Sequence, residues 1–227
     1  MLIELSFFLF LNIILKKGGG LTNNLDNSGR GNLLPIARDV IKHAKAGTMR
    51  KAKDVMRLPA SNYTDDSRFK DELNNVIKRV PIVLGPSCEI PNPGDFKTIN
   101  VAGTSLILTR TKDGKANALM NVCSHRGACL SKEEKGNRKL FTCPYHGWSF
   151  SNSGKLVAIS SESDFGKIEK KNYGLKSLPI YESAGLIWAI MNPESEVDIP
   201  NFLSGYDNML ETFAFSDWIF VSKRTFK

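Results

Sequence analysis

The hydrophobic residues in the first third of the chain recur with the spacing of α-helices. One set lies within residues 33–56 and comprises Ile36, Val40, Ile41 and Ala44. A second set lies within residues 66–79 and comprises Phe69, Leu73, Val76 and Ile77. Because its members share one helical face, the second set predicts a helix with one buried stripe. Pro81 ends this helix, so residues 33–80 are predicted to form a helical lead-in.

The spacing changes after residue 80, where short runs rich in β-branched and aromatic residues alternate with turn residues. We expect strands over residues 96–101, 105–110, 116–122, 139–142, 148–150, 155–158, 175–181, 186–191 and 218–226. The sequence Lys112-Asp113-Gly114-Lys115 between two of these runs predicts a hairpin turn. Short strands joined by tight turns are typical of antiparallel sheets, so residues 81–227 are predicted to form a mainly β domain.

The composition is that of an ordinary globular protein, with 41% hydrophobic and 24% charged residues among 227. Lys and Arg number 31 against 23 Asp and Glu, which gives a net charge of +8. The basic residues gather near residues 132–139 and 167–171, either as a solvated surface or as a docking face for an acidic partner. They are not interleaved with aromatic residues as in nucleic-acid-binding modules, so no nucleic-acid partner is expected.

The segment of residues 1–32 carries no pattern of a folded domain. Residues 2–15 are mostly apolar, but this run is shorter than the roughly 20 residues that span a bilayer, and the lysines follow it instead of preceding it. Residues 21–32 are rich in Asn, Gly and Ser and are predicted to be a linker. We therefore expect residues 1–32 to be a disordered or mis-started tail with a linker, and we expect no membrane anchor. The 4 cysteines are too unevenly spaced for a disulfide framework, which favours a reducing, cytoplasmic location.

Two short segments each pair a cysteine with a histidine. Cys123 and His125 form the first pair, Cys143 and His146 form the second, and residues 126–142 separate them. A zinc finger usually draws two cysteines from one hairpin and two histidines from a helix, although a zinc site remains an alternative. A Rieske-type 2Fe-2S cluster needs two thiolates on one iron and two imidazoles on the other. The four residues are therefore predicted to be the ligands of such a cluster.

Glycine follows each histidine closely, at Gly127 and Gly147. Without a Cβ, these positions can let backbone N–H groups approach the sulfur atoms of a cluster, and Pro144 stiffens the second segment. N–H contacts to sulfur tune the potential of a cluster. Both segments are therefore predicted to be cluster-binding loops.

The motifs resemble the Rieske domain of the aromatic-ring-hydroxylating oxygenase α subunits. They are Cys123-Ser124-His125-Arg126-Gly127, the run Cys143-Pro144-Tyr145-His146-Gly147-Trp148-Ser149-Phe150, and Gly154-Lys155-Leu156. The resemblance implies an antiparallel Rieske-type β sandwich with cluster-binding loops, preceded by a short α-helical N-terminal segment, and it covers residues 81–227. Rieske proteins of respiratory complexes add two cysteines at the positions of Ala128 and Tyr145, so this chain is more similar to the oxygenase type.

The resemblance implies an electron-transfer function. A ferredoxin or a flavin/iron-sulfur reductase would reduce the cluster, which would pass electrons to a mononuclear iron that activates O2 in a neighbouring α subunit, commonly within a trimer. The family includes dioxygenases of aromatic hydrocarbon catabolism and monooxygenases of quaternary amines. Its mononuclear Fe(II) is held by two histidines and a carboxylate, but no histidine follows His146 here. We therefore expect a partial α subunit that lacks the catalytic domain and does not oxygenate on its own.

Two other classes of function stay open. A stand-alone Rieske ferredoxin would be an electron carrier, but such proteins are shorter and lack a helical lead-in like residues 33–80. A zinc-stabilised interaction module would use the same four residues without colour or redox activity. The presence or absence of an iron–sulfur chromophore distinguishes the zinc module from the other two.

Overall fold

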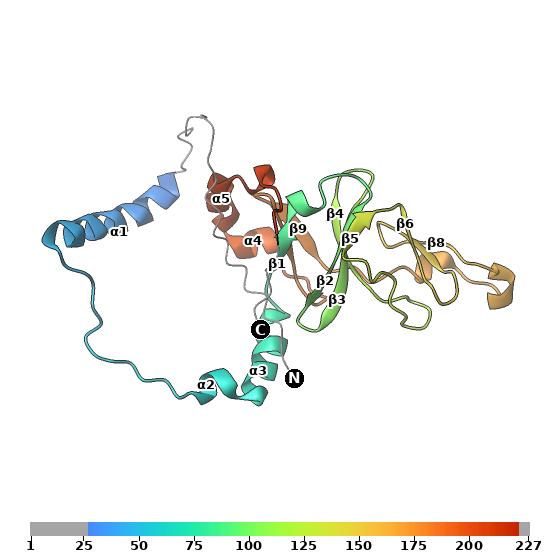
Figure 1. Ribbon diagram of the computed structural model, residues 1–227, viewed down its shortest axis with the longest axis horizontal. Coiled ribbons are helices and arrows are strands. Elements are labelled where there is room, and N and C mark those ends of the chain that lie inside the picture. Colours follow the sequence, from blue (N-terminus) through green and yellow to red (C-terminus); the bar gives the residue numbers. More distant parts are fainter. Residues whose placement is uncertain (1–26, 223–227) are drawn as a thin grey trace. The chain divides into compact units, whose positions relative to one another are not determined.

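The computed structural model describes residues 27–222, with side chains from residue 34 onward (Figure 1). The predicted tail therefore lies outside the described residues up to residue 26. The chain divides into two compact units, of which the larger comprises Pro59–Phe220. The described part of the smaller unit consists mainly of one helix.

That helix, α1, spans Asn27–Ala46 and thus begins inside the segment predicted to be a linker. The segment with helical spacing was expected to run to residue 56. The helix ends earlier because Gly47 adopts a left-handed backbone conformation, with φ +60°. The N–H of Thr48 then donates to the carbonyl of His43, which closes the helix end. No helix among the described residues combines the length and the apolar character needed to cross a membrane.

The predicted second helix is confirmed, but its buried stripe is wrong. The lead-in consists of α2 (Ser61–Thr64) and α3 (Asp66–Glu72), and α3 continues as a π-helical turn over Leu73–Ile77. Phe69 and Leu73 are half-buried, whereas Val76 is 52% and Ile77 37% exposed. The wider π turn rotates the residues that follow Leu73 away from the face that an α-helix would give them.

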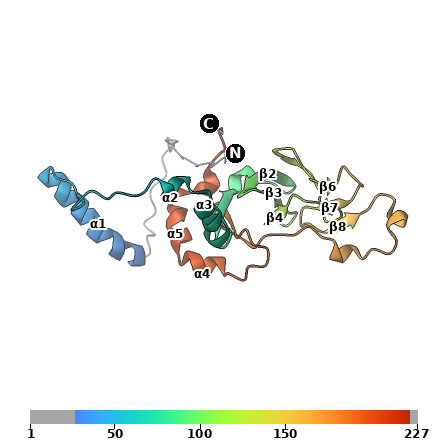
Figure 2. The same ribbon diagram turned by 90° about the horizontal axis from the view of Figure 1, so that it is seen from below.

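The larger unit contains three antiparallel sheets, which confirms the predicted mainly β fold. The four-stranded sheet has the order β4 (Ala116–Met120), β3 (Thr104–Arg110), β2 (Asp95–Val101) and β5 (Lys135–Asn137). One three-stranded sheet has the order β1 (Ile82–Pro86), β10 (Leu186–Ala189) and β9 (Ile180–Ser183). The other has the order β6 (Leu140–Thr142), β7 (Ser149–Ser151) and β8 (Leu156–Ala158), and both views place it away from α3 (Figures 1 and 2).

The strand predictions fail at the C-terminal end of the domain and at two strands that contain glycine or proline. The strand expected over residues 218–226 is absent from residues 218–222, and the remainder lies outside the described residues. Ahead of this segment, the chain forms α4 (Ile199–Leu203), α5 (Tyr206–Leu210) and two 3-10 turns, the second of which ends at Asp217. Strands β1 and β5 were not predicted. β1 contains Gly85 and Pro86 and β5 contains Gly136, all of which are depleted in strands.

A partly buried ion pair joins the four-stranded sheet to the sheet that contains β9. The guanidinium of Arg110 on β3 donates two hydrogen bonds to the carboxylate of Glu182 on β9, at 2.6 and 2.8 Å. Burial alone would raise the pKa of Glu182, but the hydrogen bonds and charge of Arg110 lower it overall. Two-point pairing of this kind fixes geometry as well as charge, so it orients the two sheets within the larger unit.

Candidate metal centre

The first cysteine–histidine segment forms a tight loop after β4. The N–H of Cys123 donates to the carbonyl of Ala128 at 2.8 Å, and the N–H of Gly127 donates to the carbonyl of Cys123 at 3.0 Å. Val122 and Cys129 pair as an antiparallel bridge at the base of the loop. Backbone hydrogen bonds therefore close the turn itself, and the buried side chain of Asn121 adds hydrogen bonds to Leu130 and Ser131 at its base.

The second segment joins β6 to β7 with the same hydrogen-bond pattern. The N–H of Cys143 donates to the carbonyl of Trp148 at 2.7 Å, and the N–H of Gly147 donates to the carbonyl of Cys143 at 3.0 Å. In both loops the cysteine is the first residue of the turn, the histidine lies within it, and a glycine closes it. The two loops thus share one backbone arrangement, and each presents one thiol and one imidazole.

The two glycines adopt left-handed backbone conformations, with φ +74° at Gly127 and φ +67° at Gly147. A Cβ at Gly127 would meet no heavy atom within 4 Å, whereas a Cβ at Gly147 would lie 2.5 Å from the Cβ of Ser160. The backbone conformation is thus one reason for glycine at both positions. At Gly147 the close approach of Ser160 is a second.

Alanine substitution is therefore expected to affect the two loops unequally. Gly127→Ala is expected to lower the free energy of unfolding by about 1 kcal/mol, because only backbone strain opposes it. Gly147→Ala is expected to lower it by about 3 kcal/mol, because Ser160 must also move. Urea unfolding of both variants measures this difference, and equal losses would contradict the close approach of Ser160.

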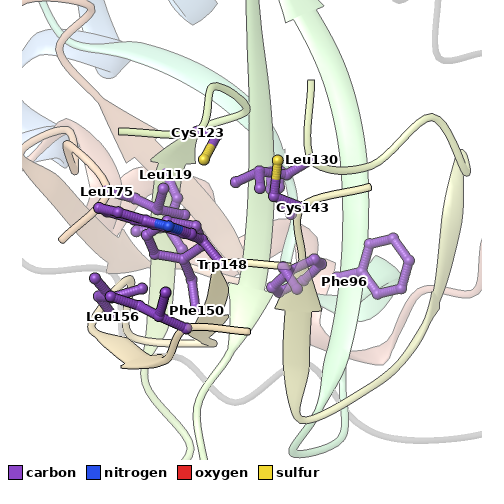
Figure 3. Close-up of a cluster of buried hydrophobic side chains, with 12 residues drawn as sticks. Phe96, Leu119, Cys123, Leu130, Cys143, Trp148, Phe150, Leu156 and Leu175 are labelled. Carbon is purple, nitrogen blue, oxygen red and sulfur yellow. The ribbon is translucent and has the colours of Figure 1, made fainter. Parts of the chain in front are cut away.

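The two thiols lie side by side in the core of the domain. Cys123 and Cys143 are each 2% exposed, both are free, and they pack in the same hydrophobic cluster as Trp148 and Leu175 (Figure 3). Burial raises the pKa of Cys123, and the neighbouring Cys143 raises it further, although the backbone N–H of His125 opposes this. A coordinated metal removes the proton of a cysteine thiol that it binds.

The two imidazoles lie together on the more exposed side of the loops. Both rings are half-buried, and their centroids are 4.8 Å apart at an interplanar angle of 72°. Partial burial lowers the pKa of His125, and the neighbouring His146 and Arg126 lower it further. The neutral imidazole that results near neutral pH is the form that ligates metals.

The structure thus brings all four predicted ligands together as a buried thiol pair and a half-buried imidazole pair. This donor set fits a binuclear cluster that takes two sulfur ligands on one iron and two nitrogen ligands on the other. The two pairs do not converge on one point as the ligands of a single metal ion would, and the described part of the chain contains no other group of three or more His, Cys, Asp or Glu side chains that could hold a metal ion. His43, the remaining histidine, lies in α1 of the other unit.

A third segment, which the sequence reasoning missed, completes the walls of the centre. Phe165 ends a 3-10 turn, and its ring meets the edge of His125 at 5.4 Å and of Trp148 at 5.8 Å. Farther along, the carbonyl of Tyr173 accepts a 2.7 Å hydrogen bond from Ser124 in the first loop. No motif marks this segment in the sequence, because its aromatic residues reach the loops only through the fold.

Comparison with known proteins identifies the domain. Residues 80–179 match the family described as Rieske [2Fe-2S] domain. The anthranilate 1,2-dioxygenase large subunit of Acinetobacter baylyi is 30% identical over 150 residues, which cover 66% of this chain and 32% of that subunit. The chain thus spans about a third of the length of this curated relative.

Two solved structures share the fold. Naphthalene 1,2-dioxygenase from Rhodococcus sp., bound to indole, superposes with a TM-score of 0.63 and 26% identity, covering 82% of this chain and 40% of its own. A quaternary ammonium Rieske monooxygenase, described in connection with carnitine oxidation and inter-subunit electron transfer, gives a TM-score of 0.63 and 27% identity, covering 70% and 44%. Residues 80–179 of this chain are therefore a Rieske [2Fe-2S] domain similar to those of the Rieske oxygenase large subunits.

Proposed function

We propose that Cys123, His125, Cys143 and His146 hold a Rieske-type 2Fe-2S cluster and that the domain transfers single electrons. The observation that carries this proposal is the pairing of the four side chains, with two buried thiols on one side and two imidazoles on the other. When bound, the cluster supplies a centre that accepts and returns one electron. The two closed loops hold its ligands, and the core beneath the thiols excludes water from them.

The cysteine pair and the histidine pair differ in solvent exposure, and this difference determines the side from which a partner can approach the centre. Both cysteines are buried among hydrophobic side chains, whereas both histidines are half-buried. An electron-transfer partner can therefore come closest to the centre at the imidazoles. The side chains of Arg126 and Tyr145 border this edge, with the guanidinium 5.6 Å from the centre of the Tyr145 ring.

Within a complete protein, the domain would serve a ring-hydroxylating oxygenase large subunit or a related monooxygenase. Its cluster would receive electrons from a ferredoxin or a flavin/iron-sulfur reductase and pass them to a mononuclear iron that activates O2. The similarity to dioxygenase and monooxygenase subunits supports this proposal. We further propose neighbouring α subunits in a trimer as partners, a reducing cytoplasmic location, and an aromatic compound or a quaternary amine as substrate.

The experiment is to purify the chain after expression with iron and sulfide supply and to record its visible and electron paramagnetic resonance spectra. The expected protein is red-brown, and its reduced form shows the resonance of a Rieske centre, because two nitrogen ligands on one iron give that signal its character. A colourless protein with stoichiometric zinc would instead support the zinc-stabilised interaction module.

A further inference from the structure

The ring of His125 lies parallel to the indole of Trp148, although the two residues belong to different loops. Their ring centroids are 4.8 Å apart and their planes differ by 11°. Offset parallel stacking at this distance is a favourable arrangement of aromatic rings. The second loop thereby contacts the histidine of the first loop, and its own histidine meets that ring only edge-on.

Packing fixes the plane of the indole. Trp148 is 1% exposed, and the rings of Phe165 and Tyr173 meet it edge-on at 5.8 and 5.5 Å. Its carbonyl also accepts the hydrogen bond that closes the second loop. A side chain held in this way has little freedom to turn, so the face that it offers to His125 is fixed.

No hydrogen bond within the described residues orients either imidazole. A metal-bound histidine usually donates its second ring N–H to a carboxylate or carbonyl, which fixes the ring. Among the described residues, neither His125 nor His146 makes a side-chain hydrogen bond. His146 rests against Tyr145, at 3.9 Å between ring centroids, but Tyr145 is 60% exposed and is not held by the core.

The indole N–H does not account for the contact. The Nε1 atom of Trp148 is buried without a hydrogen-bond partner among the described groups. A buried unpaired donor is costly, so its presence calls for a reason. Because the N–H meets no acceptor there, the ring face is the part of Trp148 that contacts a predicted ligand.

We propose that Trp148 is a positioning residue that sets the ring plane of His125 by stacking and so holds this ligand in its cluster-binding orientation. The proposal rests on the proposed function, since it assigns a role toward the 2Fe-2S cluster. Loss of the stack frees the imidazole to rotate, which changes the iron–nitrogen geometry and weakens retention of the cluster.

The test compares Trp148→Leu, Trp148→Phe and Phe150→Leu in the iron-loaded 227-residue protein. Phe150 provides the matched control, because it is fully buried in the same core cluster and has no ring contact with His125. Trp148→Leu is expected to shift the g-values of the reduced centre and to release iron to a chelator roughly 10-fold faster. Trp148→Phe, which keeps a stacking face, and Phe150→Leu are expected to keep the wild-type g-values.

The remaining outcomes overturn the proposal in distinguishable ways. Wild-type g-values and iron release in Trp148→Leu would show that the stack does not position the ligand. An equal shift in Trp148→Phe would assign the effect to the indole N–H, and an equal shift in Phe150→Leu would assign it to general core packing. If the wild-type protein itself shows no Rieske signal, the proposed function fails, and this inference fails with it.

Discussion

Replacement of His125 or His146 by alanine is expected to abolish the resonance signal of the Rieske centre. In the proposed site each imidazole supplies one of the two nitrogen ligands of one iron, and alanine offers no donor atom. The two rings lie side by side, so the loss of either leaves that iron with an open position on the solvent side. Spectra and iron and sulfide contents of the purified variants measure the effect.

Two substitutions of the same kinds serve as controls. His43→Ala removes the histidine of α1, which belongs to the other unit of the chain. Cys129→Ser alters an exposed cysteine of the first cluster loop whose thiol contacts only the carbonyl of Ser131 among described groups. Both variants are expected to keep the wild-type signal. A normal signal in His125→Ala would contradict the ligand assignment.

The 227-residue chain is expected to accept electrons without forming any oxygenated product. Activation of O2 at a non-haem iron of the family type needs two histidines and a carboxylate. Of the 3 histidines in the chain, two are assigned to the cluster, and His43 alone cannot supply the remaining pair. Incubation with reductase, O2, added Fe(II) and a panel of aromatic acids, hydrocarbons and quaternary amines, followed by mass spectrometry, tests this expectation.

The control for that experiment is reduction of the cluster itself. Anaerobic mixing with a reduced ferredoxin or reductase should bleach the visible spectrum, which shows that the electron-accepting centre is intact. A product-forming activity that co-purifies with the 227-residue chain, and that is absent without the chain, would disprove the expectation that this chain does not oxygenate. It would require an iron site with ligands other than the family's histidine pair.

Local sequence patterns predicted most of the strands and the two loops that pair a cysteine with a histidine. Strands β2, β3 and β4 follow alternating or continuous runs of apolar residues, and a hairpin turn at Gly114 separates the last two. The paired cysteines and histidines were recognisable because the two members of each pair lie within four residues of each other. Features set by neighbouring residues are those that sequence reasoning recovers.

The features that depend on the fold were not predictable in the same way. The π turn after α3 leaves no signature in its apolar spacing, so Val76 and Ile77 were wrongly placed in a buried stripe. Trp148 belongs to the second motif, but its stack on His125 depends on how the two loops approach each other. Phe165 lies 40 residues beyond His125 in the sequence, and only the tertiary structure joins them.

Main-chain hydrogen bonds close the turn of each cluster loop, and the side chains at the tips of the loops take no part in them. Every residue type except proline carries the amide hydrogen that such hydrogen bonds use. The backbone shape of the two loops therefore does not depend on the side chains at their tips. Arg126 and Tyr145 occupy those tips, next to the imidazoles. The tip side chains can therefore differ between relatives of this domain while the turns keep their shape.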